Sequence, residues 1–424
     1  MSSSFTVVWI TAFLFILPVS SAAETLLRFV TWKPEVPRVW DEAIADFERA
    51  NPGVRVVAEI GPQSSTQFHD LITQKLKNRD SSLDVFVMDV IWPAEFASAG
   101  WALPLDGVFT TAAQRQFLRP PLTANRYAGR IFGVPLFIDA GLLYYRRDLL
   151  EKYSFAPPRY WPELVEDAKA ILKSERDPQL TGFSAQFKQY EGLVCNMMEF
   201  IISNGGALWD ESRRKSAIDQ RPAVDAIRFV RDEIVAQISN QGVLAYEEPE
   251  SLALFTEGRA IFHRNWPYAG VIANDSRRSK VAGRVGMSPL PSFPGHPGAS
   301  TLGGWQLAIS RFSQHPELAW RFVSFITGEA MQKRIAIDLG KAPTRVSLYN
   351  DDQVRAAIPQ LRILREIFEQ AVPRPVTPVY TPLSNILQRY FSSALTLPTV
   401  DLRRRSAAAA REMDRVLDLL NQRS

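Results

Sequence analysis

The sequence predicts a doubly wound α/β protein, and three observations support this fold class. Residues 26–100 alternate in pattern between short apolar strands and amphipathic helices, in the order strand, helix, strand, helix, strand. Residues 137–145 form an almost continuous apolar run, which is typical of a strand covered by helices on both faces. Residues 147–242 are mostly helical in pattern, and a chain of 424 residues can form two domains or one large one.

The N-terminal part shows the alternation most clearly. Trp40, Ile44 and Phe47 recur at helical spacing, and an Asn-Pro-Gly turn at 51–53 stops that helix. Asp89 ends the third strand, and ligands of doubly wound sheets bind outside the carboxyl ends of the strands. Asp89 is therefore a candidate ligand-binding residue, although it could instead cap the next helix. The elements expected here are strands at 26–31, 54–60 and 84–89 and helices at 39–50, 65–77 and 92–100.

Residues 135–153 predict a strand at 137–145, followed by a helix that starts near Arg147. Asp139 interrupts the apolar run, and a buried carboxylate is costly unless it is paired or hydrogen-bonded. Gly141 follows, and a glycine inside a strand often marks a bend or a close backbone approach. The combination indicates a polar cleft crossed by the chain. The structural alternative is an Asp139 paired with an arginine or with backbone N–H groups.

The rest of the chain adds helices and strands with aromatic residues at their ends. Trp266 and Tyr268 flank a proline at a helix entry, and two glycines precede Trp305 in a strand, where they let a ligand or another backbone approach closely. The expected elements are helices at 161–174, 192–204, 223–238, 315–327 and 402–422 and strands at 285–289 and 301–309, with a helical segment after 345 that is broken at 372–375.

The composition argues against several classes of function. The formal net charge is +4, and basic residues lie beside acidic ones, so no nucleic-acid partner is expected. A single cysteine excludes an intrachain disulfide, and the four histidines show no metal-binding spacing. The sequence has no phosphate-binding glycine loop, nucleophile elbow or other catalytic motif. We therefore expect no metal, no cofactor and no enzymatic activity.

Residues 1–23 have most features of an export signal peptide. The apolar core at 5–17 is short for a transmembrane helix, Pro18 ends it, and small residues at 21–23 suit a signal peptidase. The departure from the usual pattern is that no Lys or Arg precedes this core. We expect a soluble periplasmic protein after cleavage.

Aromatic and charged residues gather at the expected ends of strands and helices. The C–H faces of sugars stack on aromatic rings, while sugar hydroxyl groups donate to carboxylates and accept from arginine. The set therefore indicates sugar recognition, although any one tryptophan could be a core residue. Its members are Trp92, Trp266, Tyr268, Trp305, Asp89, Asp139 and Arg374.

Several long motifs resemble one known family. They are VFVMDVIW, IDAGLLYYRRDLLEKY, KQYEGLVCNMMEFIISNGG, RNWPYA, PLPSFPGH, STLGGW and AVPRPVTPVY, and they cover essentially the whole mature chain. The chain resembles the trehalose/maltose-binding proteins of ABC importers, within extracellular solute-binding protein family 1. The resemblance implies a periplasmic-binding-protein fold, in which two α/β lobes joined by three crossovers close on a sugar.

The resemblance also implies site residues, lobes and partners. Glu35 is expected near the pocket, while Phe137 and Gln67 stand where the family has a tyrosine and an arginine. The full implied pocket is Asp89, Asp139, Trp266, Tyr268, Gly304, Trp305, Arg374, Glu35, Gln67 and Phe137. One lobe is expected at 24–138 and 308–345 and the other at 139–307 and 346–424, with crossovers near 138–141, 305–309 and 345–349. The expected partners of this monomer are an α-linked disaccharide and the permease subunits of an ABC transporter.

Two other functions remain open on the sequence alone. A secreted glycoside hydrolase would use Asp89 and Asp139 as its carboxylate pair. A sugar sensor would instead pass the signal of the bound sugar to a membrane receptor.

Overall fold

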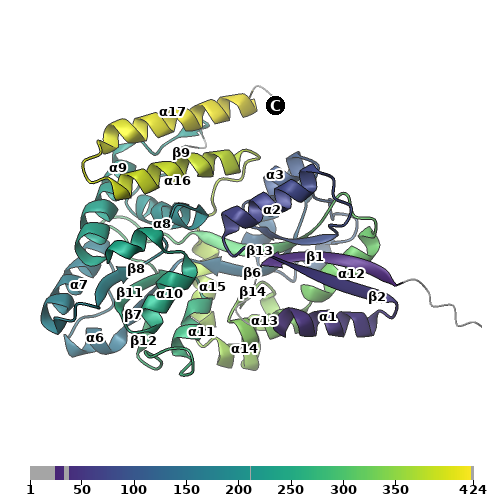
Figure 1. Cartoon of the computed structure of the whole chain (residues 1–424), viewed down its shortest axis with the longest axis horizontal. Coiled ribbons are helices and arrows are strands. Elements are labelled where there is room, and N and C mark those ends of the chain that lie inside the picture. Colours follow the sequence, from purple (N-terminus) through teal and green to yellow (C-terminus); the bar gives the residue numbers. More distant parts are fainter. Residues whose placement is uncertain (1–23, 33–37, 211, 422–424) are drawn as a thin grey trace, which may run out of the picture.

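The computed structural model describes residues 24–32, 38–210 and 212–421. Two β-sheets, each flanked by helices, form two lobes that lie side by side (Figure 1). The expected signal peptide at 1–23 and Glu35 lie outside the described residues. No helix in the described part of the chain is long and apolar enough to cross a membrane.

The first lobe is built on a six-stranded sheet with the order β14-β6-β13-β3-β1-β2. β1 pairs in parallel with β2 and β3, whereas β13 runs antiparallel to both β3 and β6. The strands are β1 (Thr25–Trp32), β2 (Val54–Gly61), β3 (Val85–Asp89), β6 (Val134–Ala140), β13 (Leu302–Ile309) and β14 (Ala342–Pro343).

The second lobe is built on a four-stranded sheet with the order β12-β7-β11-β8. Its strands are β7 (Leu142–Arg146), β8 (Thr181–Ser184), β11 (Ala260–Asn265) and β12 (Val285–Ser288). Two small two-stranded antiparallel sheets lie outside these two. They are β4 (Arg126–Tyr127) with β5 (Arg130–Ile131), and β9 (Trp209–Asp210) with β10 (Lys215–Ser216).

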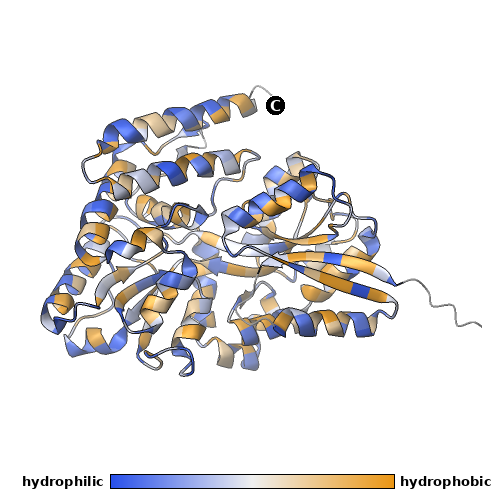
Figure 2. Cartoon of the chain, viewed as in Figure 1, coloured by the Kyte–Doolittle hydropathy of each residue, from blue (hydrophilic) through white to orange (hydrophobic). Residues whose placement is uncertain are grey.

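The covering helices bury their apolar faces against the sheets, as in α1, where Trp40, Ala43 and Phe47 are buried. Figure 2 shows hydrophobic residues concentrated in the strands and alternating with hydrophilic ones along the helices. Near the first sheet the helices are α1 (Arg38–Ala50), α2 (Ser65–Lys77), α3 (Pro93–Ser98), α4 (Thr111–Gln114), α5 (Arg119–Ala124), α12 (Pro316–Ile326) and α13 (Glu329–Leu339). The others are α6 (Arg147–Lys152), α7 (Trp161–Glu175), α8 (Glu191–Ile202), α9 (Arg221–Phe229), α10 (Glu248–Thr256), α11 (Tyr268–Asn274), α14 (Asp352–Ala357), α15 (Leu361–Gln370), α16 (Tyr380–Thr396) and α17 (Leu402–Asn421), with a π-helix at Val230–Ile238 and 3₁₀-helices at Gln241–Ala245 and Val346–Asn350.

The expectation of one strand over residues 137–145 is wrong, because the run is divided between the two sheets. β6 ends at Ala140 in the first sheet and β7 begins at Leu142 in the second, so the chain crosses between the lobes at Gly141. A Cβ at Gly141 would collide with the side chains of Glu199 and Arg264. Glycine is therefore needed here because two side chains approach the chain closely, and not because another backbone does.

The chain crosses again between β12 and β13. β13 pairs with β6 from Leu302 onward, so the strand has already joined the first sheet before the lobe boundary expected at residue 307. A hydrophobic cluster packs beneath these crossings and contains residues of both sheets, including Ile138 and Ala140 of β6 and Leu142 and Tyr144 of β7. This cluster connects the cores of the two lobes.

Candidate functional site

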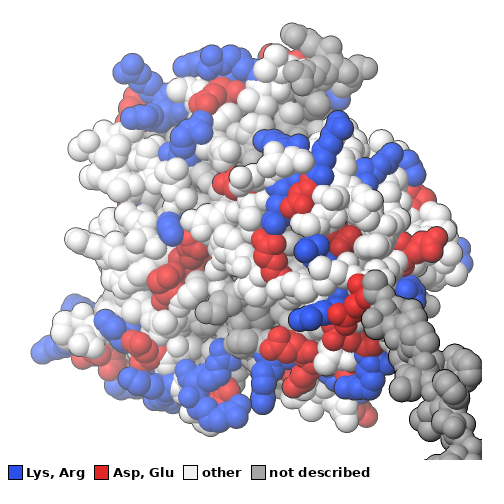
Figure 3. All heavy atoms as spheres, turned by 45° about the vertical axis from the view of Figure 1, so that its right-hand side comes forward, with Lys and Arg blue, Asp and Glu red and all other residues white. Residues whose placement is uncertain are grey.

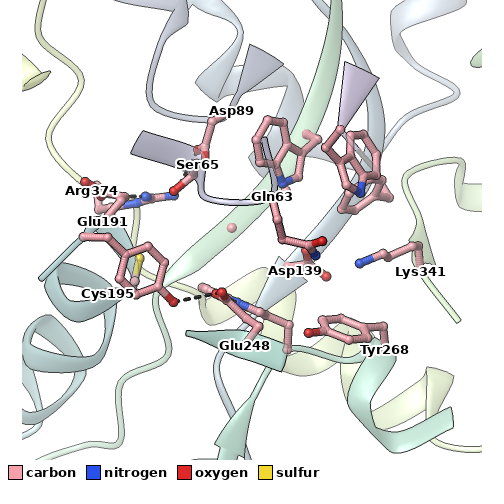
Figure 4. Close-up of a pocket in the computed structure, with 18 residues that line it drawn as sticks. Gln63, Ser65, Asp89, Asp139, Glu191, Cys195, Glu248, Tyr268, Lys341 and Arg374 are labelled. Atoms are coloured by element: carbon pink, nitrogen blue, oxygen red, sulfur yellow. Dashed lines mark hydrogen bonds and ion pairs between the residues drawn. The ribbon is translucent and has the colours of Figure 1, made fainter. Parts of the chain in front are cut away.

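A cavity of about 100 Å³ lies between the two sheets, and eight of the residues selected from the sequence line it (Figure 4). Gln67 does not line it and is exposed on α2, whereas Gln63 and Ser65 just before it do line the cavity. The eight are Asp89, Phe137, Asp139, Trp266, Tyr268, Gly304, Trp305 and Arg374.

Strand register brings three of these residues together. β13 pairs Trp305 with Asp89 of β3 on one side, and Gly303 with Asp139 of β6 on the other. Asp89 is the last residue of its strand, as expected, and Asp139 is the last but one of β6. The two carboxylates thus reach the cavity from strands that flank β13.

Arg374 links the two lobes at one side of the cavity. Its Nη2 donates to Oδ1 of Asp89 on β3 at 3.3 Å, and its Nη1 donates to Oε1 of Glu191 on α8 at 2.8 Å. Tyr380 donates its hydroxyl to the same Glu191 oxygen at 2.6 Å, and Ser384 donates to the other. All five side chains are nearly buried, so these bonds fix the guanidinium with little competition from water.

The pKa of the Asp89 carboxyl group is higher than that of an ordinary aspartate. Burial raises its pKa to about 6, and nearby Glu191 adds to the rise although Arg374 opposes it. The group also accepts the backbone N–H of Ile91 at 3.3 Å, two residues into the turn before α3. Asp89 does not cap α3, whose N-cap is Trp92, but it stabilises the turn before this helix and lies in the cavity wall.

The Trp266 ring is held in place by polar partners. The guanidinium of Arg264 lies over the ring, 4.1 Å from its centre, and the indole Nε1 donates to Glu248 at 3.0 Å. Arg264 is itself fixed by a buried ion pair with Glu199, whose carboxylate accepts its Nε–H at 2.8 Å. One face of Trp266 is thus covered by a cation, and the residue still lines the cavity.

Trp305 is half-buried in an aromatic cluster of the first lobe. Its ring stacks on Trp32 with centroids 5.5 Å apart and meets Trp92 edge-on at 5.6 Å. The preceding Gly304 has φ +127°, and a Cβ there would lie 2.6 Å from the carbonyl oxygen of Phe137. The close approach predicted for this glycine is therefore made by another backbone, that of β6.

Sequence reasoning missed several residues that line the cavity. Glu191 offered a signal, since a carboxylate that opens a strongly apolar helix needs a buried partner. Glu248 and Lys341 offered none, because each lies in a segment where a charged residue is ordinary. The missed residues include Gln63, Ser65, Tyr190, Glu191, Cys195, Glu248 and Lys341.

The cavity offers aromatic faces, hydrogen-bond acceptors and two cations. Two positively charged side chains line it, those of Lys341 and Arg374. Four carboxylates line it as well, those of Asp89, Asp139, Glu191 and Glu248. Across the described ranges, no cluster of three or more His, Cys, Asp or Glu is arranged to hold a metal ion. This chemistry suits the recognition of an uncharged ligand rich in hydroxyl groups.

Comparison with known proteins gives one consistent result. The family model described as bacterial extracellular solute-binding protein matches residues 33–333. A probable ABC transporter-binding protein of Deinococcus radiodurans is 34% identical over 341 residues, which is 80% of this chain and 80% of that protein. The structure of maltose-bound T. maritima MalE3 is 37% identical, with a TM-score of 0.86 over 93% of this chain and 100% of that one. The mannitol-binding protein of Pseudomonas aeruginosa is 24% identical over 77% of this chain and 78% of that protein.

Proposed function

Because the chain belongs to the bacterial extracellular solute-binding protein family of ABC importers, we propose that it captures an α-linked disaccharide and delivers it to a membrane permease. Trehalose, maltose or a related glucoside is the proposed ligand. The relatives are binding proteins, so the chain is a binding protein and not an enzyme. The hydrolase alternative is therefore set aside.

The lining of the interlobe cavity carries the proposal. Half-buried Trp305 and the fixed ring of Trp266 offer flat apolar surfaces on which the C–H faces of a pyranose stack. Asp89 and Asp139 accept hydrogen bonds from sugar hydroxyl groups, and Arg374 donates them. Hydrogen bonds to charged groups contribute about 1.5–3 kcal/mol each, so a few of them suffice for tight binding.

Relatives support the sugar class more strongly than the size of the sugar. The 37% identical T. maritima protein was solved with maltose, which favours a disaccharide. A mannitol-binding relative at 24% identity argues for including linear polyols among the ligands to be tested. We propose the disaccharide because charged groups line both sides of the cavity (Figure 4).

The proposed setting is the periplasm, with the protein acting as a monomer. Lys and Arg are interspersed with Asp and Glu on the face shown in Figure 3, and this face carries no broad surface of one charge. Such a surface suits a protein that diffuses freely between its ligand and its permease.

Calorimetric titration with trehalose, maltose, sucrose, mannitol and glucose tests the proposal. We expect tight binding of at least one α-linked disaccharide and weaker binding of glucose and mannitol. At about 100 times the dissociation constant, the ligand should raise the free energy of unfolding by ~2.7 kcal/mol. Preference for mannitol over every disaccharide would contradict the proposed ligand, and release of free glucose from the bound sugar would contradict a pure binding role.

A further inference from the structure

A buried lysine in the cavity wall has no role in the function proposed so far. Lys341 is only 5% exposed, and its side chain extends toward the cavity (Figure 4). An ammonium group is costly to bury without compensating interactions. Its Nζ lies 3.9 Å from the centre of the Tyr268 ring and 5.2 Å from that of Phe137, so two rings contribute to stabilising the charge.

The backbone around Lys341 holds it in this place. Gly340 ends α13 in the left-handed conformation, with φ +66°, and turns the chain directly into β14. A Cβ at Gly340 would lie 2.7 Å from the side chain of Val271 on α11, so the end of α13 is packed tightly against α11. Because α11 begins at Tyr268, this packing fixes the distance between Lys341 and the Tyr268 ring.

Strand pairing also sets Lys341 beside a carboxylate of the site. β14 pairs antiparallel with β6, with Ala342 opposite Ile138 and Pro343 opposite Phe137. One step further in this register, Lys341 comes opposite Asp139, which lines the same cavity. A donor with three N–H groups and an acceptor with two oxygens thus face the ligand space from neighbouring positions.

The cavity therefore has two charged ends. Figure 4 shows Arg374, Asp89 and Glu191 on one side and Lys341 with Tyr268 on the other. Each end combines a cation with a carboxylate, and aromatic rings also line the cavity. A ligand with hydroxyl groups at both ends and apolar faces matches this arrangement.

We propose that Lys341 is a specificity-determining residue, which donates hydrogen bonds to the hydroxyl groups of one sugar ring while Asp139 accepts from them. The Arg374 end receives the second ring. This inference rests on the proposed function and extends it, because it states which residues distinguish a two-ring sugar from a single ring.

Calorimetric titration of wild type, Lys341→Met and Lys333→Met with maltose, trehalose and glucose tests the inference. Methionine keeps most of the length of the lysine side chain but removes its charge and donors. We expect the dissociation constant of the preferred disaccharide to rise about 10- to 100-fold in Lys341→Met. Lys333 is the matched control, because it lies on α13, pairs with Asp351 at 2.6 Å and does not line the cavity. Its substitution should change the dissociation constant less than twofold.

The outcomes separate this inference from the function on which it rests. A wild type that binds none of the sugars contradicts the proposed function, whereas a wild type that binds and a Lys341→Met variant that binds equally well contradicts the inference alone. A lower ligand-free melting temperature with unchanged affinity also overturns it, because Lys341 would then be structural. If Lys341→Met does not fold, Lys341→Arg takes its place, since it keeps the charge but moves the donors, and unchanged affinity in that variant overturns the inference.

Discussion

At the scale of single residues, burial and charge pairing act in opposite directions on the pKa of Asp89. Its pKa in the folded protein is about 6, against an ordinary value of 3.8. Between these two values the folded protein holds a proton at Asp89 that the unfolded chain has lost. Asp89 therefore lowers the free energy of unfolding as the pH rises from about 4 to about 6, by an amount on the order of 3 kcal/mol.

The variant Asp89→Asn isolates this effect. Burial lowers the pKa of His263 to about 3, so His263 acts in the opposite direction, and stability is lost as the pH falls below about 6.5. Because His263 is present in both proteins, its contribution cancels in the difference between them. We expect the free energy of unfolding of Asp89→Asn, minus that of wild type, to increase between pH 4 and pH 6.5 in urea titrations. A constant or decreasing difference would contradict the pKa assigned to Asp89.

Single residues were predictable where they broke a pattern. Asp139 stood out as a charge in an apolar strand and Asp89 as the end of one, and both line the cavity. Lys341 and Glu248 broke no local pattern, and only the fold brings them to the site. Gln67, carried over from the family resemblance, is exposed on α2 two residues after Ser65, which lines the cavity.

At the scale of elements, β13 depends on a glycine that no other residue can replace without strain. Gly304 has φ +127°, and its missing Cβ leaves room for the Phe137 carbonyl oxygen of β6. Gly304→Ala should lower the free energy of unfolding by at least about 2 kcal/mol, as measured by chemical denaturation. Gly283→Ala is the matched control, since Gly283 has φ +76° but no atom within 4 Å of its Cβ position. Equal losses in the two variants would show that crowding against β6 is unimportant.

Element types were easier to predict than their arrangement. The helix over residues 39–50 was predicted from the spacing of Trp40 and Phe47, and the structure buries both side chains. The apolar run at 137–145 could not reveal that its two halves belong to different sheets. A strand that is buried on both faces has the same apolar sequence pattern in either sheet. Likewise, the helical pattern at 223–238 does not disclose that a π-helix replaces the α-helix from Val230.

At the scale of the whole molecule, the lobes also touch outside the cavity between them. Thr381 at the start of α16 donates to Glu95 of α3 at 2.5 Å, and Glu95 also bonds His69 of α2 at 3.1 Å. The Thr381–Glu95 bond joins helices of the two lobes, the Glu95–His69 bond lies within the first lobe, and none of these residues lines the cavity. If the lobes separate to admit the ligand, such contacts favour the closed form and raise the apparent affinity.

Thr381→Val should therefore weaken sugar binding about two- to tenfold, although Thr381 does not line the cavity. Calorimetry would give the affinity, and small-angle X-ray scattering would show whether the ligand-free protein becomes more extended. Thr123→Val is the control, because the Thr123 hydroxyl donates to the carbonyl oxygen of Arg119 within its own short helix. Unchanged affinity in Thr381→Val would mean that these contacts do not influence closure.

The overall architecture was accessible from the sequence, because alternating strands and helices leave few folds to choose from. The meeting of Arg374 with Asp89, residues 285 positions apart in the chain, was not. No local pattern encodes such a contact, and the two residues were grouped only by their shared chemistry and by the family resemblance.

Cys195, the sole cysteine of the chain, is 2% exposed at the cavity wall. Burial raises the pKa of its thiol, so the thiol stays protonated and unreactive at neutral pH. A maleimide dye would then label a cysteine introduced at the rim of the cavity and leave the native one untouched. One substitution and one coupling step would convert ligand capture into a fluorescence signal, so this chain is a ready starting point for an optical biosensor.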